Sequence, residues 1–311
     1  MSNVARGVYP TMITPFTADN RVDYDAVEKV TEWYAENGCE GVFAVCQSSE
    51  MFYLSLDEKI NIANKVMSVA KKQSRPMSVV CSGHTSDSIE AQAEELNAMI
   101  ETGADAVVLV SNRFDLKNEG DSVWIKNAEK LLSKLPSDAK LGIYECPVPY
   151  KRLLTREILD WCKDTGKFLF IKDTCCNPDL LVERLEQLEG SGIKLFNANS
   201  QTLLHALKHG AAGFSGIMGN FYPALFVWLC REFKNHPIEA EHLQELITMC
   251  SFAGMSYPVT AKYYLSSIGI DMDLHTRSRS SDEVDAYQKM VIDQMRKLTD
   301  RVKACLDKGD F

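Results

Sequence analysis

Short, strongly apolar runs alternate along this chain with longer segments in which apolar residues recur at helical spacing. Eight of the apolar runs have the length and composition of buried strands. They span residues 8–16, 41–46, 76–83, 106–110, 140–146, 168–173, 194–199 and 213–218. Because each run is apolar on both faces and a helical segment follows it, the pattern predicts a parallel sheet covered by helices.

The helical segments between these runs end with ordinary stop signals. They span residues 24–37, 57–72, 86–102, 121–135, 155–165, 177–188 and 201–209. Gly38, Gly103 and Gly210 follow three of them, as glycine commonly does at a helix end. Further helical pattern follows the eighth strand, at 222–234, 238–252, 258–267 and 281–307.

Eight strand–helix units predict an α/β fold, a (β/α)₈ TIM barrel over residues 1–220 with a C-terminal helical appendage over 221–311 packed on it. An open doubly wound sheet is the main alternative. That fold usually has a glycine-rich phosphate turn after the first strand, and residues 14–17 do not form one.

Composition narrows the classes of function. The 311 residues carry a formal net charge of −9, which argues against nucleic acid or an anionic membrane as a partner. No apolar run reaches the roughly 18 residues of a membrane span, and the first residues lack an apolar signal core, so we expect a cytoplasmic protein. The ten cysteines show no C-x-x-C spacing, so we expect no metal site.

Polar residues follow the predicted strands, where a barrel gathers its chemistry. Lys172 ends the sixth apolar run. If it is buried, the lysine is partly neutral and can attack a ketone. Judged by its position alone, a lysine after a strand more commonly points into solvent. Tyr144 ends the fifth run and is either a proton shuttle or a core tyrosine. Ser48 and Ser49 follow the second run as either a carboxylate nest or a helix cap.

The remaining strand ends offer weaker candidates. Asn199 and Ser200 either bind substrate hydroxyls or close a turn, and Ser215 lies on the eighth run. Glu50 is expected to be a structural hydrogen-bond acceptor that orders its loop. His84, at the end of the third run, is more simply a loop histidine than a base.

Several motifs resemble the dihydrodipicolinate synthase / N-acetylneuraminate lyase family of pyruvate-type class I aldolases, over nearly the whole chain. The similar stretches are 7–16, ending in Thr-Pro-Phe; 45–50, in the place of a G-[ST]-T-G-E loop; 144–147, like Y-N-x-P; 171–173, like I-K-[ED]; and 257–262, like N-P-x-x-x-K. The resemblance implies that Lys172 forms a Schiff base with a 2-oxo acid, that Tyr144 relays protons, and that Ser48 and the Ser49 backbone hold the carboxylate. It also implies a homotetramer and no cofactor beyond the imine on Lys172.

The departures from the family pattern concern the substrate. Cys46 and Ser49 replace the loop glycines, and Gln47 replaces the first hydroxyl residue. Pro149 stands where the synthase branch has an arginine, and Asn199 lies in a stretch that differs from the lyase branch. These differences disfavour both the lysine-biosynthetic reaction and a sialic acid substrate. We therefore expect Ser49, Gln47, Asn199, Ser215 and Arg113 to bind substrate.

Lys151 and Arg152 are alternatives to Arg113 as the cation for a different acid. The first hypothesis is a lyase or aldolase that cleaves or condenses a 2-oxo acid, with pyruvate as one partner. A Schiff-base dehydratase or deaminase, a synthase-type condensation and a non-catalytic 2-oxo acid-binding barrel are the alternatives.

Overall fold

Eight parallel strands form the centre of the molecule. The structure is a computed structural model that describes residues 4–253 and 256–309. The strands are β1 (Gly7–Val8), β2 (Gly41–Ala44), β3 (Ser78–Cys81), β4 (Ala106–Val110), β5 (Leu141–Tyr144), β6 (Phe168–Asp173), β7 (Lys194–Asn197) and β8 (Gly213–Phe214). Their order is β1-β8-β7-β6-β5-β4-β3-β2, and a parallel bridge from Thr11 to Phe43 joins the two ends of the sheet. The predicted (β/α)₈ barrel is confirmed.

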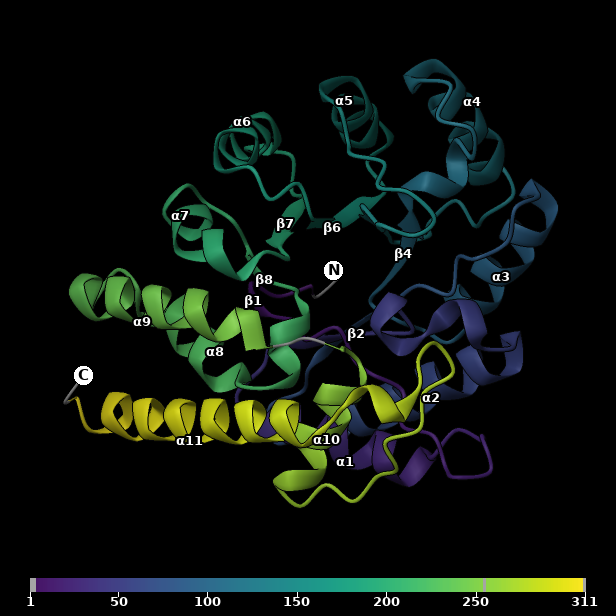
Figure 1. Cartoon of the computed structure of the whole chain (residues 1–311). Helices are drawn as coiled ribbons and strands as arrows, with labels where there is room; N and C mark the ends of the chain where they lie inside the picture. Colours follow the sequence, from purple (N-terminus) through teal and green to yellow (C-terminus); the bar gives the residue numbers. More distant parts are fainter. Residues whose placement is uncertain (1–3, 254–255, 310–311) are drawn as a thin grey trace.

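Helices surround the strands (Figure 1). The barrel helices are α1 (Tyr24–Glu36), α2 (Leu56–Lys72), α3 (Ile89–Glu101), α4 (Asp121–Leu132), α5 (Arg156–Thr165), α6 (Pro178–Leu188), α7 (Leu203–Lys208) and α8 (Pro223–Glu232). The helices that follow are α9 (Pro237–Cys250), α10 (Val259–Ser267) and α11 (Ala286–Lys308). Helix α8 packs against β1 and completes the eighth strand–helix unit, although the predicted division at residue 220 places it in the appendage.

Two predicted strands are much shorter than the apolar runs suggested. Residues 8–16 pair beyond Val8 only through isolated bridges, and residues 217–220 form a 3₁₀ helix. The backbones of the paired, parallel strands β1 and β8 approach closely here, because a Cβ at Gly213 would lie 1.8 Å from the carbonyl oxygen of Gly7. Gly213 also has φ +154°, a conformation that side chains rarely adopt. Here the backbones approach too closely for side chains between them.

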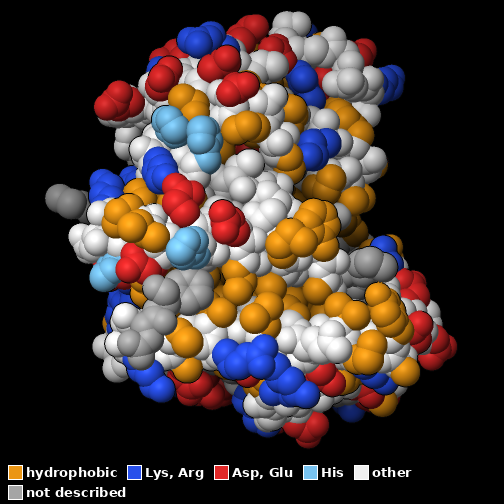
Figure 2. Space-filling model, turned by 60° about the vertical axis from the view of Figure 1, so that its left-hand side comes forward, with side chains coloured by type: hydrophobic (Ala, Val, Ile, Leu, Met, Phe, Trp, Pro, Cys, Tyr) orange, Lys and Arg blue, Asp and Glu red, His pale blue; other side chains and the backbone are white. Residues whose placement is uncertain are grey.

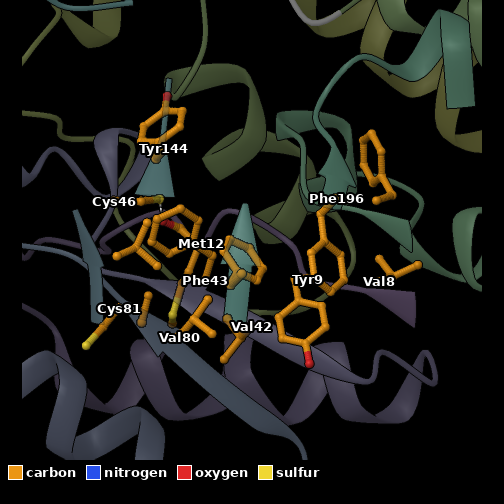
Figure 3. Close-up of a cluster of buried hydrophobic side chains, with 14 of the residues drawn as sticks. Val8, Tyr9, Met12, Val42, Phe43, Cys46, Val80, Cys81, Tyr144 and Phe196 are labelled. Carbon is orange, nitrogen blue, oxygen red and sulfur yellow. Dashed lines mark hydrogen bonds between the residues drawn. The ribbon is translucent and has the colours of Figure 1, made fainter. Parts of the chain in front are cut away.

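Aromatic rings fill the barrel interior (Figure 3). The rings of Tyr9 and Phe196 meet edge to face at 4.8 Å, and those of Phe170 and Phe196 stack at 4.6 Å. Phe43 joins them and also contacts the ring of Tyr144 at 6.0 Å. A dry, close-packed interior of this kind holds the strand ends rigidly and removes water from beneath them.

The segment between α10 and α11 is fastened to the β2 end of the barrel. Glu50, in the left-handed conformation at φ 59°, accepts hydrogen bonds through Oε1 from the amides of Arg277 (2.8 Å) and Ser278 (2.7 Å). Arg277 also forms an ion pair with Glu58 at 2.7 Å. The prediction that Glu50 is a structural acceptor is confirmed, and the loop that it orders comes from the far end of the sequence.

Candidate active site

Lys172 lies at the carboxyl end of β6, directly beside Tyr144 in the register of β5 and β6. Its Nζ lies 4.1 Å from the centre of the Tyr144 ring and 5.6 Å from that of Phe43. The residue is 4% exposed. Burial lowers the pKa of the lysine, and the nearby thiols of Cys46 and Cys146 oppose this only in part.

The neighbouring carboxylates are turned away from Lys172. Asp173 points to the opposite face of β6, where Arg184 of α6 binds both it and Glu145, the latter at 2.8 Å. Glu145 in turn accepts hydrogen bonds from the amides of Leu154 (2.7 Å) and Thr174 (2.8 Å). This buried cluster joins the ends of β5 and β6 and leaves the lysine amine among aromatic rings and thiols.

Tyr144 is a hydrogen-bond donor in this site. Its hydroxyl donates to Oε1 of Gln47 at 2.9 Å, and the thiol of Cys146 approaches the same oxygen at 3.5 Å. Burial raises the pKa of the phenol well above its usual value, and the charges of neighbouring thiols add to the rise. Tyr144 is therefore a neutral phenol held beside the amine of Lys172.

A second phenol, Tyr257, faces the cavity from the segment before α10. Its oxygen accepts a hydrogen bond from Nδ2 of Asn220 at 3.1 Å and also interacts with the Ser48 hydroxyl. Ser48 itself donates to Oγ1 of Thr11 at 3.1 Å. The sequence analysis did not single out Tyr257. Its signal was the tyrosine standing in place of the asparagine of the N-P-x-x-x-K stretch.

Ser49 serves the structure of its loop. Its hydroxyl donates to the carbonyl of Met12 at 2.6 Å and accepts from the amide of Cys46 at 3.0 Å, while its own amide donates to the Cys46 carbonyl. The resemblance assigned the Ser49 backbone to a carboxylate cradle. Its amide is instead engaged within the protein, and so is its side chain. The neighbouring Ser48 and Gln47 face the cavity.

The cavity at the carboxyl ends of the strands has a volume of about 530 Å³. Several loops build its wall, and the polar lining residues include Gln47, Ser48, Tyr144, Lys151, Lys172, Thr174, Cys176, Asn199, Tyr257, Ser278 and Arg279. Asn199 also caps the following 3₁₀ turn through a 3.0 Å bond from the Thr202 amide, so both of its predicted roles are compatible with its position. Arg279 was not among the candidates from the sequence.

Of the predicted cations Lys151, Arg113 and Arg152 and the predicted hydroxyl of Ser215, only Lys151 lines the cavity. Lys151 lines the cavity, and its Nζ donates to the Thr174 carbonyl at 2.7 Å. Arg113 does not line it: its guanidinium forms an ion pair with Asp87 at 2.7 Å. Arg152 pairs with Asp121 at 2.5 Å, also outside the cavity lining. Ser215, directly after β8, is fully buried, and its hydroxyl has no hydrogen-bond partner in the described residues.

His84 is buried and lies outside the cavity lining. Its two ring nitrogens are engaged by Gln92 at 2.9 Å and by the amide of Val110 at 3.0 Å, and burial lowers its pKa to about 4. Within residues 4–253 and 256–309, no three His, Cys, Asp or Glu side chains are grouped as metal ligands would be. Over the same residues, no helix combines the length and apolar character needed to cross a bilayer.

Comparisons with known proteins agree with this geometry. The model of the Dihydrodipicolinate synthetase family matches residues 4–294. The 4-hydroxy-tetrahydrodipicolinate synthase of Clostridium perfringens is 25% identical over 243 residues, 77% of this chain and 79% of that protein. The enzyme of the same name from Methanocaldococcus jannaschii is 25% identical over 241 residues, 76% of each chain.

Solved structures show the same fold. Ruminococcus gnavus sialic acid aldolase superposes with a TM-score of 0.84 at 15% identity, covering 96% of this chain and 98% of that one. Dihydrodipicolinate synthase DapA-2 of Bacillus anthracis gives 0.82 at 16% identity, covering 94% and 97%. The predicted family is confirmed: this chain belongs to the Dihydrodipicolinate synthetase family and is an enzyme of the class I aldolase and lyase type.

Proposed function

We propose that Lys172 forms a Schiff base with a 2-oxo acid, with pyruvate as one reaction partner. The observation that carries the proposal is the buried amine with a lowered pKa, placed in the cavity beside a phenol and facing away from the nearest carboxylates. A lowered pKa increases the fraction of neutral amine, which is the form that attacks the keto carbon. Relatives support the choice of pyruvate: solved structures of the Acinetobacter baumannii synthase and of E. coli YagE contain it.

The protonated imine is then the electron sink for making or breaking a carbon–carbon bond, so we propose that no cofactor takes part. Tyr144 lies where it can assist proton transfer while the carbinolamine forms and loses water. Ser48 lies where it can donate a hydrogen bond to the substrate carboxylate. Lys151 and Arg279, from two different loops, supply positive charge to the wall of the cavity.

We also propose a homo-oligomer, a homotetramer as the family resemblance implies. Figure 2 shows hydrophobic side chains gathered in the hollow of one face of the molecule. Exposed large hydrophobic residues on and next to α9 and α11 include Ile238, Met249, Phe252, Tyr287 and Met290. Association of copies would remove such side chains from water. Light scattering tests this proposal.

A cytoplasmic location and a small-molecule partner complete the proposal. All ten cysteines are unpaired, which suits a reducing compartment, and the net charge of −9 is unfavourable for binding nucleic acid or an anionic membrane.

Trapping with borohydride tests the chemistry. Incubation with pyruvate and borohydride is expected to add the mass of a reduced pyruvate adduct, located at Lys172 by peptide mass spectrometry. Lys172→Ala is expected to abolish the adduct. Lys167→Ala, a change at a half-buried lysine directly before β6 and so at the far end of that strand from Lys172, is expected to leave it unchanged. Absence of an adduct in the wild type, or its persistence in Lys172→Ala, would contradict the proposal.

Product analysis then identifies the reaction. A panel of 2-oxo-3-deoxy acids, followed by mass spectrometry, separates carbon–carbon cleavage from dehydration or deamination, because only cleavage releases pyruvate and an aldehyde. Incubation of pyruvate with aldehydes tests condensation, the reverse direction. The 4-hydroxy-tetrahydrodipicolinate synthase reaction, for which the relatives described above are named, belongs to the same test.

A further inference from the structure

The cavity differs in character between its buried floor and its exposed rim. The floor holds Lys172, which is 4% exposed, and Tyr144, which is 3% exposed. The rim holds two exposed cationic side chains, Lys151 from the loop after β5 and Arg279 from the segment between α10 and α11. With the keto carbon of a substrate at Lys172, the part of the substrate furthest from that carbon extends towards this rim.

Little negative charge in the cavity offsets the two cations of the rim. Among the described residues that line the cavity, Glu50 is the only acidic one. Its Oε1 accepts from the amides of Arg277 and Ser278, and its Oε2 lies 4.0 Å from Nζ of the buried Lys262. Its charge is therefore engaged within the protein, and the rim has a positive potential that attracts an anion.

Lys151 reaches across the rim towards the end of β6. Its Nζ donates a hydrogen bond to the carbonyl of Thr174, 2.7 Å away, and an ammonium has three hydrogens to donate. Thr174 lines the cavity and follows Lys172 by two residues. This bond holds the Lys151 amine beside the chain that leaves the reactive lysine, and two of its hydrogens remain for a ligand.

Arg279 also has donors to spare. Its Nη1 binds Glu283 at 2.6 Å, in a pair whose side chains are 46% and 40% exposed. Exposed pairs of this kind contribute little to stability, so the pair is easily exchanged for a ligand. Through its remaining N–H groups the guanidinium can also bind an oxygen anion without giving up Glu283.

The segment that carries Arg279 is held in place by Arg277. The five N–H groups of the Arg277 guanidinium bind the carboxylate of Glu58, the carbonyl of Tyr53, and both the carbonyl and the side-chain oxygen of Asn20. Its guanidinium also lies 4.4 Å from the centre of the Phe16 ring. A segment fixed in this way presents its cation to a ligand with little further loss of conformational freedom.

We propose, on the basis of the proposed function, that Lys151 and Arg279 bind a negatively charged group at the far end of the substrate. The 2-oxo acid then carries a second anion in addition to the carboxylate next to its keto group. This anion is a carboxylate or a phosphate, because both present the oxygen acceptors that lysine and arginine recognise. The cavity volume of about 530 Å³ leaves room for the carbon chain that joins the two groups.

Trapping three 2-oxo acids of matched length tests the proposal without knowledge of the natural substrate. The acids are 2-oxohexanoate, 2-oxoadipate and 2-oxo-5-phosphonopentanoate, which carry a methyl group, a carboxylate and a phosphonate on C5. Borohydride trapping at increasing concentrations gives the half-saturation point of each. In the wild type at least one anionic acid is expected to half-saturate at a concentration about 10-fold lower than the methyl acid, the effect of one charge-assisted hydrogen bond. The acid with the larger advantage identifies the group as carboxylate or phosphate.

Removing the cations tests the assignment to these two residues. Lys151→Met and Arg279→Met are each expected to reduce the advantage of the anionic acid, and the double variant is expected to abolish it. Because the readout is a ratio of two acids in one variant, a general change in trapping cancels. Lys117→Met is the matched control, since Lys117 is exposed on the loop before α4 and lies outside the cavity lining. Its ratio is expected to equal that of the wild type.

The possible failures are distinguishable. If the wild type forms the pyruvate adduct but shows no preference for either anionic acid over 2-oxohexanoate, the assignment is overturned and the proposed function stands. A preference that persists in the double variant, or that is lost in Lys117→Met, would also overturn the assignment. If the wild type forms no adduct with pyruvate or with any of the three acids, both proposals are wrong.

Discussion

Removing Arg184 tests whether the buried charge cluster beneath the site is essential for stability. The guanidinium is 3% exposed and binds Glu145 and Asp173, which are 0% and 1% exposed. Arg184→Met keeps most of the volume but leaves two buried carboxylates side by side. Breaking a buried ion pair by removing one partner costs about 3–5 kcal/mol. We expect a loss of that size in the free energy of unfolding at pH 8.

The retained backbone hydrogen bonds keep the loss within this range. Glu145 still accepts from the amides of Leu154 and Thr174, and Asp173 from that of Cys175 at 2.9 Å. Burial already raises the pKa of Glu145, the charge of Asp173 adds to this, and Arg184 opposes it. Without the arginine, the folded-state pKa rises further above its unfolded value. The folded protein then binds an extra proton as the pH falls, so the loss shrinks towards pH 5.

Urea denaturation of wild type and Arg184→Met at pH 5.5 and pH 8 measures both effects. The double variant Arg184→Met/Asp173→Asn is the matched control, because it removes one carboxylate while Oδ1 can still accept from the amide of Cys175. It is expected to recover part of the loss at pH 8. A loss below about 1 kcal/mol, or an equal loss at both pH values, would refute the reasoning.

Two further predictions concern the lysine and the barrel closure. Because burial lowers the pKa of Lys172, the rate of borohydride trapping should rise with pH and have its midpoint below 10.5, the pKa of an ordinary lysine. A midpoint at pH 10.5 would show that the amine is solvated. Gly213→Ala should cost more than about 4 kcal/mol in thermal unfolding, because its Cβ would overlap the Gly7 carbonyl, whereas Gly103→Ala, with φ +77° and open space, should cost much less. Equal melting temperatures for the two alanine variants would contradict this.

The sequence by itself determined the architecture and the central pair of the site. Apolar runs report which segments are buried on both faces, and eight of them with intervening helices specify a barrel. Lys172 and Tyr144 end consecutive runs, and consecutive parallel strands pair, so their proximity follows from chain order. Strand lengths at β1 and β8 did not follow, because the close backbone approach at Gly213 overrides the local pattern.

Only the tertiary structure decided which residues complete the wall of the cavity. Tyr257 and Arg279 come from the C-terminal segments, and Glu50, by binding the amides of Arg277 and Ser278, fastens the loop that carries Arg279. Arg113 was predicted in the site, yet it pairs with Asp87 outside the cavity lining. Periodicity encodes burial and local conformation, whereas the path of a returning loop depends on a few long-range hydrogen bonds that leave no periodic trace in the sequence.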